Sequence, residues 1–147
     1  MIGPVQAGPA WAKTEPLDFV RKGMQHRGPE RPPRAALAAN RPELRRLWDR
    51  FDQRGKRPII RFEKNVAILA NAAGSSSCPY RLHALRLDGE RERVVVRVYQ
   101  EEFEENQVCT ADVQARTYTV AVPRAGLRPF RPRDLKVHIR RIDDPNS

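Results

Sequence analysis

The spacing of apolar residues changes near residue 59, from a helical period to a strand period. Before that point the large apolar residues fall at i, i+3, i+4 and i+7, namely Leu44, Leu47, Trp48 and Phe51. Asn40 is a good N-cap, and Glu43 completes a capping-box pattern. Gly55 is placed to end the helix. The pattern predicts one amphipathic helix whose apolar stripe must cover another surface.

Short strands follow the helix. Residues 66–70 form a continuous apolar run, which is typical of a strand buried on both faces. Alternation changes phase near Ala84, which predicts a bulge, and Asp88-Gly89 is a hairpin-turn signal. Further alternating positions are Val94, Val96 and Val98, residues 118–122, and Leu135, Val137 and Ile139. We therefore expect an α+β fold: five or six mostly antiparallel strands, as a small sheet or sandwich, packed with one helix.

The first 39 residues differ in composition from the rest, because they hold 6 of the 13 prolines and 4 of the 8 glycines. Both residue types disfavour regular structure. We expect residues 1–39 to form an extended arm, with one short helix around residues 17–20 and Met24. Residues 40–142 would form the helix-plus-β domain, and residues 143–147 a tail.

No apolar run among the 147 residues approaches the ~20 needed to span a bilayer, so a membrane-spanning protein is excluded. Residues 1–8 show neither the cationic region nor the apolar stretch of a signal peptide. Ala10-Trp11-Ala12 nevertheless resembles a signal-peptidase site. Two interpretations stay open: a true start further upstream, or chance in an Ala-rich sequence.

The chain is basic, with 28 Lys and Arg against 18 Asp and Glu and a net charge of +10. Such a field attracts nucleic acid, anionic lipid or acidic proteins, although heavy use of Arg across a genome would give the same composition. Cations are densest near the carboxy terminus, where the candidate partner-binding residues are Arg124, Arg128, Arg131, Arg133, Lys136, Arg140 and Arg141. For nucleic acid, stacking aromatics should alternate with Arg; Arg97-Val98-Tyr99 and Arg116-Thr117-Tyr118 come closest.

No pattern for catalysis, a cofactor or a metal is present, so we expect no enzyme activity and no cofactor. Ser75, Ser76 and Ser77 lack the spacing of a nucleophile elbow and are typical of a loop. The three histidines are scattered, and the acidic run at 101–105 lacks the pattern of a calcium loop. Cys78 and Cys109 have too few companion ligands for zinc. They are either two buried thiols in a reducing compartment or one disulfide in an oxidising one.

The order of elements over residues 40–123 resembles the carboxy-terminal β domain of PrcB-type protease-complex-subunit proteins. It resembles even more closely a group of secreted or lipid-anchored bacterial proteins in which G-S-S-S-C-P is followed later by C-T-A-D. Here those stretches are Gly74-Ser75-Ser76-Ser77-Cys78-Pro79 and Cys109-Thr110-Ala111-Asp112. The resemblance implies a small bacterial extracytoplasmic domain with a Cys78–Cys109 disulfide.

The same resemblance implies a non-enzymatic structural or accessory protein that binds and stabilises a larger protein assembly through its β domain and arm. The second interpretation is a basic protein that binds nucleic acid or another anionic surface. A third is a protease inhibitor that presents the loop of residues 74–79. Fold-level analogy does not name the partner.

Overall fold

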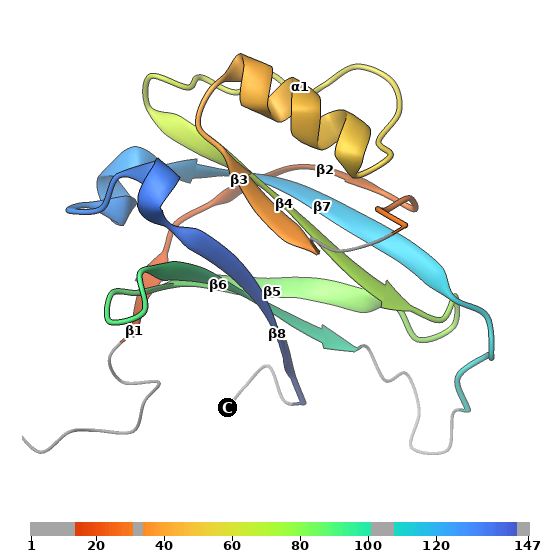
Figure 1. Ribbon diagram of the computed structural model, residues 1–147. Helices are drawn as coiled ribbons and strands as arrows, with labels where there is room; N and C mark the ends of the chain where they lie inside the picture. Colours follow the sequence, from red (N-terminus) through yellow and green to blue (C-terminus); the bar gives the residue numbers. More distant parts are fainter. Residues whose placement is uncertain (1–13, 31–33, 101–107, 144–147) are drawn as a thin grey trace, which may run out of the picture.

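The computed structural model describes residues 14–30, 34–100 and 108–143, and in these ranges the chain forms one α-helix and eight β-strands (Figure 1). The helix is α1 (Arg41–Arg50). The strands are β1 (Thr14–Leu17), β2 (Val20–Gln25), β3 (Ala35–Ala38), β4 (Asn65–Gly74), β5 (Tyr80–Asp88), β6 (Arg93–Gln100), β7 (Gln114–Pro123) and β8 (Lys136–Ile142). Two short 3-10 turns, Arg124–Leu127 and Pro132–Asp134, join β7 to β8. The expected α+β class is confirmed.

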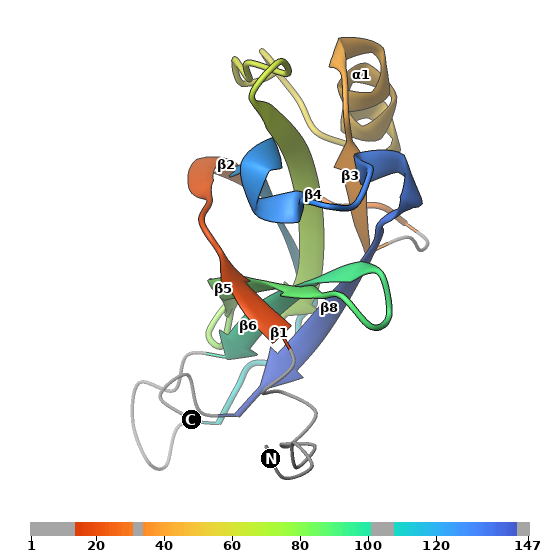
Figure 2. The ribbon, with the colours of Figure 1, turned by 90° about the vertical axis from the view of Figure 1, so that its left-hand side faces the viewer.

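The elements stack in three layers. One sheet has the strand order β1-β5-β6-β8, and the other has the order β2-β7-β4-β3. The two sheets pack face to face, and α1 covers the outer face of the β2-β7-β4-β3 sheet (Figures 1 and 2). Pairing is antiparallel except between β6 and β8, which run parallel.

Strand β4 lies at the centre because both of its faces are apolar. Val66, Ile68 and Ala70 point into the core between the two sheets, while Ala67 and Leu69 belong to a second core beneath α1. This is the period-2 alternation of a strand. The predicted burial of residues 66–70 on both faces is confirmed, since all five are at most 3% exposed.

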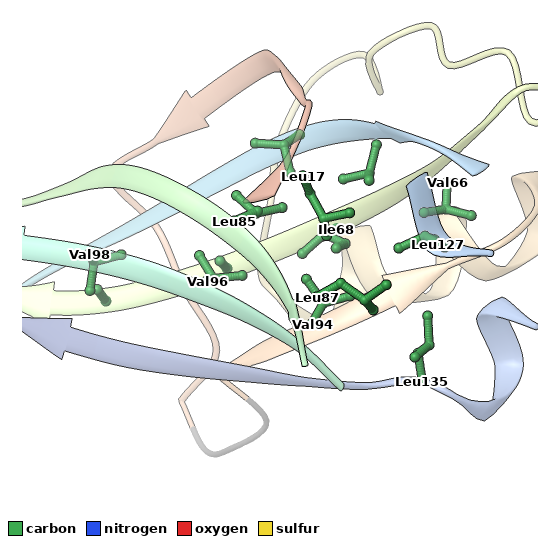
Figure 3. Packing of buried hydrophobic residues seen from close by; sticks show 14 residues of the cluster. Leu17, Val66, Ile68, Leu85, Leu87, Val94, Val96, Val98, Leu127 and Leu135 are labelled. Atoms are coloured by element: carbon green, nitrogen blue, oxygen red, sulfur yellow. The ribbon is translucent and has the colours of Figure 1, made fainter. Parts of the chain in front are cut away.

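The core between the sheets is built mainly from aliphatic side chains (Figure 3). Val94, Val96 and Val98 of β6 face it, as predicted from their alternation. The register of β5 against β6 shifts between Leu82 and Ala84. This confirms the bulge, and its effect is to return Leu85 and Leu87 to the core side.

Helix α1 begins as the sequence predicts but ends earlier. The Asn40 side chain accepts a hydrogen bond from the Glu43 backbone N–H at 2.9 Å, and the Glu43 carboxylate accepts one from the Ala39 N–H at 2.9 Å. Gly55 was expected to end the helix, but the last helical residue is Arg50. Asp52, at φ 54, already takes the left-handed conformation that aspartate tolerates.

Three segments of the range expected to be an arm pair with the sheets instead. β1 pairs with β5, β2 with β7 and β3 with β4. The helix expected around residues 17–20 and Met24 is wrong, because Leu17 ends β1 and Met24 lies in β2. All three strands lie at sheet edges, where hydrogen bonds are needed on one side only and proline is tolerated. Pro16 of β1 and Gly23 of β2 are therefore accommodated in edge strands.

A buried polar cluster holds the segment after β2 against the sheet. The Asn71 side-chain amide donates to the Thr117 hydroxyl at 3.0 Å, and this hydroxyl donates to the Arg27 carbonyl at 2.5 Å. Gln53 donates to the same carbonyl at 3.1 Å. Gly28 passes so close that an added Cβ would lie 2.1 Å from Nδ2 of Asn71. Glycine is required at position 28 because its backbone lies so close to the Asn71 side chain.

We expect Gly28→Ala to lower the free energy of unfolding by about 1–3 kcal/mol, as overpacking does, because its methyl group displaces the Asn71 side chain. Gly23→Ala is the matched control, since a Cβ there meets nothing within 4 Å. Denaturant unfolding of both variants measures the difference. Equal stability of the two variants would contradict the close approach at Gly28.

Candidate functional site

Cys78 and Cys109 form a disulfide with a Cα–Cα distance of 5.5 Å. The pairing that the resemblance implies is thus present in the structure. The bond joins the loop after β4 to the segment before β7, and these are neighbouring strands of one sheet. In the chain-entropy description, closing a loop of about 30 residues stabilises the fold by roughly 3.5–4 kcal/mol.

Side-chain hydrogen bonds support the same junction. The Cys78 N–H donates to the Ser75 hydroxyl at 3.0 Å, and the Thr110 N–H donates to the Ser77 hydroxyl at 2.8 Å. The Asp112 carboxylate accepts from the Ser76 N–H at 3.3 Å and from the Thr110 hydroxyl. The serine oxygens thus serve loop structure, which agrees with the loop interpretation. Ser75 and Cys78 are also buried, whereas Ser76 between them is exposed.

These hydrogen bonds lower the pKa of the exposed Asp112 carboxyl below its ordinary value, chiefly through the Thr110 hydroxyl and next through Ser76. Hydrogen bonds to the charged form favour that form. The hydrogen bonds of the Asp112 carboxylate therefore stabilise the junction at pH values above the unfolded pKa of Asp112. This stabilisation is lost as the pH falls through the lowered pKa of the folded state.

The described residues hold no group of three or more His, Cys, Asp or Glu side chains that fits a metal ion. In the same part of the chain, no helix is long and apolar enough to cross a bilayer. The acidic run at 101–105 and the residues 10–12 lie outside the described residues. His26 follows β2, His83 lies in β5 and His138 in β8.

The seven predicted basic residues do not form one surface. Arg124 is structural: its Nε donates to the Phe62 carbonyl at 2.6 Å and its Nη2 to the Ala39 carbonyl at 2.5 Å. Arg128, Arg131 and Arg133 are exposed on the turns before β8. The Arg141 guanidinium lies over the Tyr80 ring at 4.9 Å.

Lys136 and Arg140 lie on the outer face of the β1-β5-β6-β8 sheet, since the intervening Val137 and Ile139 pack against the core. Strand register places other cations beside them. Arg93 pairs with Lys136, and Arg97 pairs with Arg140. We call this surface the basic sheet face; its cations are Arg81, Arg86, Arg93, Arg97, Lys136 and Arg140.

Two of these arginines are held by the fold. Arg86 donates to the Thr14 hydroxyl and carbonyl at 2.5 and 2.9 Å, and so joins β5 to β1. The Nε of Arg93 lies 3.3 Å from Oδ2 of Asp88, a carboxylate that is largely buried. The other cations are less engaged: Lys136 and Arg140 are exposed, and Arg97 is half-buried. Asp88 is the one carboxylate in the paired rows that carry these cations.

Aromatic rings lie beside the cations at one end of the basic sheet face. Tyr99 pairs with Arg81, and its ring meets the His83 ring edge to face, with centroids 5.9 Å apart. The other pattern singled out for stacking is excluded, because Tyr118 is 2% exposed and donates its hydroxyl to the Tyr80 carbonyl at 2.8 Å.

A cleft of about 340 Å³ continues the basic sheet face around the β8 edge. It lies between β8, Arg34 just before β3, and Asn71 and Ala72 of β4. Its lining residues are Arg34, Asn71, Ala72, His138, Ile139, Arg140 and Arg141. Three guanidinium groups around one open cleft suit a carboxylate or phosphate group.

The sequence pattern indicated Arg97 and Tyr99 but missed Arg81 and Arg86 as members of the same surface. The sequence did contain a signal for these two arginines. Residues 81 and 86 lie on either side of the bulge and alternate with apolar residues, so both belong to the outer face of the sheet. The pairing of β8 with β6 left no signal in the sequence, because a parallel partner is not set by a hairpin turn.

We expect Cys109→Ser to lower the free energy of unfolding by about 2–5 kcal/mol, because the unfolded chain regains the entropy of the open loop. Cys78→Ser should lose at least as much, since Cys78 is buried. Thermal unfolding with and without reductant measures both losses. Reduced wild-type protein is the control and should match Cys109→Ser. An unchanged melting temperature under oxidising conditions would contradict the role of the bond.

We expect Thr110→Val to raise the pKa of Asp112 toward 3.8, because the largest cause of its lowering is removed. Carboxyl-carbon NMR during an acid titration measures the midpoint. Thr14→Val, far from this loop, should leave the Asp112 midpoint unchanged. A midpoint that does not move in Thr110→Val would show that this hydroxyl does not stabilise the carboxylate.

Comparison of the chain with family models, curated proteins and solved structures finds no match.

Proposed function

We propose that this protein is a non-enzymatic accessory protein that binds an acidic surface of a larger protein assembly. The observation that carries the proposal is the basic sheet face. Six cations share one outer sheet surface with a single carboxylate in their rows, and in the described part of the chain no helix covers it (Figure 1).

The two outer faces of the sandwich differ in a way that supports binding. The part of the outer face of the β2-β7-β4-β3 sheet that lies beneath α1 is apolar. The outer face of the other sheet carries Arg97, Lys136 and Arg140, and within the described residues none of these three cations forms an ion pair. Like charges held close together repel one another. An acidic partner relieves this repulsion and is steered toward the face.

In this proposal the binding surface is the basic sheet face and not the arm expected at residues 1–39. Residues 14–17, 20–25 and 35–38 are strands of the sheets, so they support the domain. The disulfide is compatible with an oxidising compartment. An extracytoplasmic place of action therefore belongs to the same proposal.

A second candidate function is binding of single-stranded nucleic acid on the same face. The observation that favours it is Tyr99 with His83 against its ring and Arg81 and Arg97 on its flanks. Aromatic rings beside cations are how such proteins stack bases. Salt dependence tests it, because log K falls with log salt by roughly 0.7 for each phosphate contacted.

The experiment is site-specific photo-crosslinking in cells. A photoreactive residue at His138, which is exposed beside Arg140, should give one crosslinked product that protease destroys and nuclease leaves intact. The same residue at Lys22, exposed on β2, is the control position and should give no such product. Arg97→Glu with Arg140→Glu should reduce the product at position 138 several-fold.

Arg46→Glu with Arg50→Glu is the matched charge control, because it changes net charge equally on exposed positions of α1. It should leave the crosslinked product unchanged. A product sensitive to nuclease would favour the second candidate. Equal crosslinking at positions 22 and 138, or none at 138, would overturn the proposal.

A further inference from the structure

A groove of about 500 Å³ lies on the other side of the molecule, between α1 and the chain that follows it. After α1 the chain turns through Gly55, at φ 76, and runs back beside the helix before entering β4 (Figure 1). We call this the helix groove. Its lining residues are Arg41, Leu44, Arg45, Gly55, Lys56, Arg57, Pro58, Ile59, Ile60 and Phe62.

The floor of the helix groove is apolar. Leu44 and Ile60 are buried at its base, and Phe62 is half-buried. Ile59 is 84% exposed on its wall. An exposed large apolar side chain beside an apolar hollow leaves apolar surface that a bound molecule can cover. Burial of such surface stabilises a complex by about 25 cal/mol per Å².

The rim of the helix groove is positively charged. Arg41, Arg45, Lys56 and Arg57 are all exposed, and the described lining contains no Asp or Glu. Nearby carboxylates are engaged elsewhere: Glu43 accepts from the Ala39 N–H, and Asp52 pairs with Arg27 at 2.7 Å. In the part of the chain that the structure describes, none of these four cations forms an ion pair.

The walls of the helix groove are held in place by a residue remote in sequence. One guanidinium, that of Arg124, binds the Ala39 carbonyl just before α1 and the Phe62 carbonyl at the end of the returning chain. Hydrogen bonds to a charged donor are stronger than neutral ones. The groove is thus shaped before any occupant arrives, which lowers the cost of binding.

We infer that the helix groove binds an acidic peptide segment of a protein partner, with one or two large apolar side chains on the apolar floor and its carboxylates against the cationic rim. The volume lies in the usual range for binding clefts, about 300–1,000 Å³. A membrane surface fits less well, because Leu44 and Ile60 lie at the base of a hollow that a bilayer does not enter. This site goes beyond the proposed function, since it lies on a different layer from the basic sheet face.

The test is an NMR titration of the full chain with the peptide acetyl-EDLFEE-amide. Backbone signals of Leu44 and of residues 56–62 should shift, and those of the basic sheet face should not. The neutral peptide acetyl-QNLFQQ-amide and the peptide without apolar residues, acetyl-EDGSEE-amide, should each bind about tenfold more weakly, a difference of about 1.4 kcal/mol.

Three variants locate the site. Ile59→Asp should weaken binding about tenfold or more, while Val113→Asp, at a residue 82% exposed elsewhere, should not change it. Arg41→Glu should also weaken binding. This variant should keep its fold, because a negatively charged side chain is favourable in the first turn of a helix. Arg97→Glu with Arg140→Glu should leave peptide binding intact, so that failure here is separate from failure of the proposed function.

Three results would overturn the inference. One is peptide binding that Ile59→Asp leaves unchanged. Another is stronger binding of the wild type to vesicles of phosphatidylcholine and phosphatidylglycerol than to the peptide, with loss in Ile59→Asp, since this would assign the groove to lipid. The third is self-association of the chain that Ile59→Asp abolishes, since this would assign the groove to a second copy.

Discussion

The pairing of β4 with β7 is the interaction on which the rest of the structure depends. The two strands pair along ten positions, from Asn65 with Pro123 to Gly74 with Gln114. Each side of this pair supports a separate core: the other sheet packs on one side and α1 on the other. If the pair did not form, neither α1 nor the β1-β5-β6-β8 sheet would have a surface to cover.

At both ends of the β4–β7 pair, specific interactions join the chain segments that flank the two strands. At the end of Gly74 and Gln114, the disulfide and the hydroxyls of the serine loop join the flanking segments. At the end of Asn65 and Pro123, the Arg124 N–H donates to the Lys64 carbonyl at 2.8 Å. One closure is covalent, and the other is a main-chain hydrogen bond of Arg124, whose guanidinium also holds the walls of the helix groove.

Local pattern predicted the elements whose partners are near in sequence. The capping box of Asn40 and Glu43, the run at 66–70 and the bulge near Ala84 all follow from spacing over a few residues. Elements whose partners are distant were missed. β1, β2 and β3 are only four to six residues long, and they form because β5, β7 and β4 offer backbone hydrogen-bond partners. The basic sheet face was seen in part for the same reason, since the β6–β8 neighbourhood is set by packing and not by local sequence.

The sheet edges have a consequence for how this protein meets other molecules. The four edge strands are β1, β8, β2 and β3. β1 and β3 are four residues long, and β1 contains Pro16. β2 has a register shift between Arg21 and Gly23, and β8 carries Lys136 and two arginines. Short length, proline, irregular register and charge are the devices that discourage the joining of strands between molecules. In the part of the chain described by the structure, the sheet edges thus discourage the addition of a strand from another molecule. Recognition of other molecules then depends on the side chains of the outer layers.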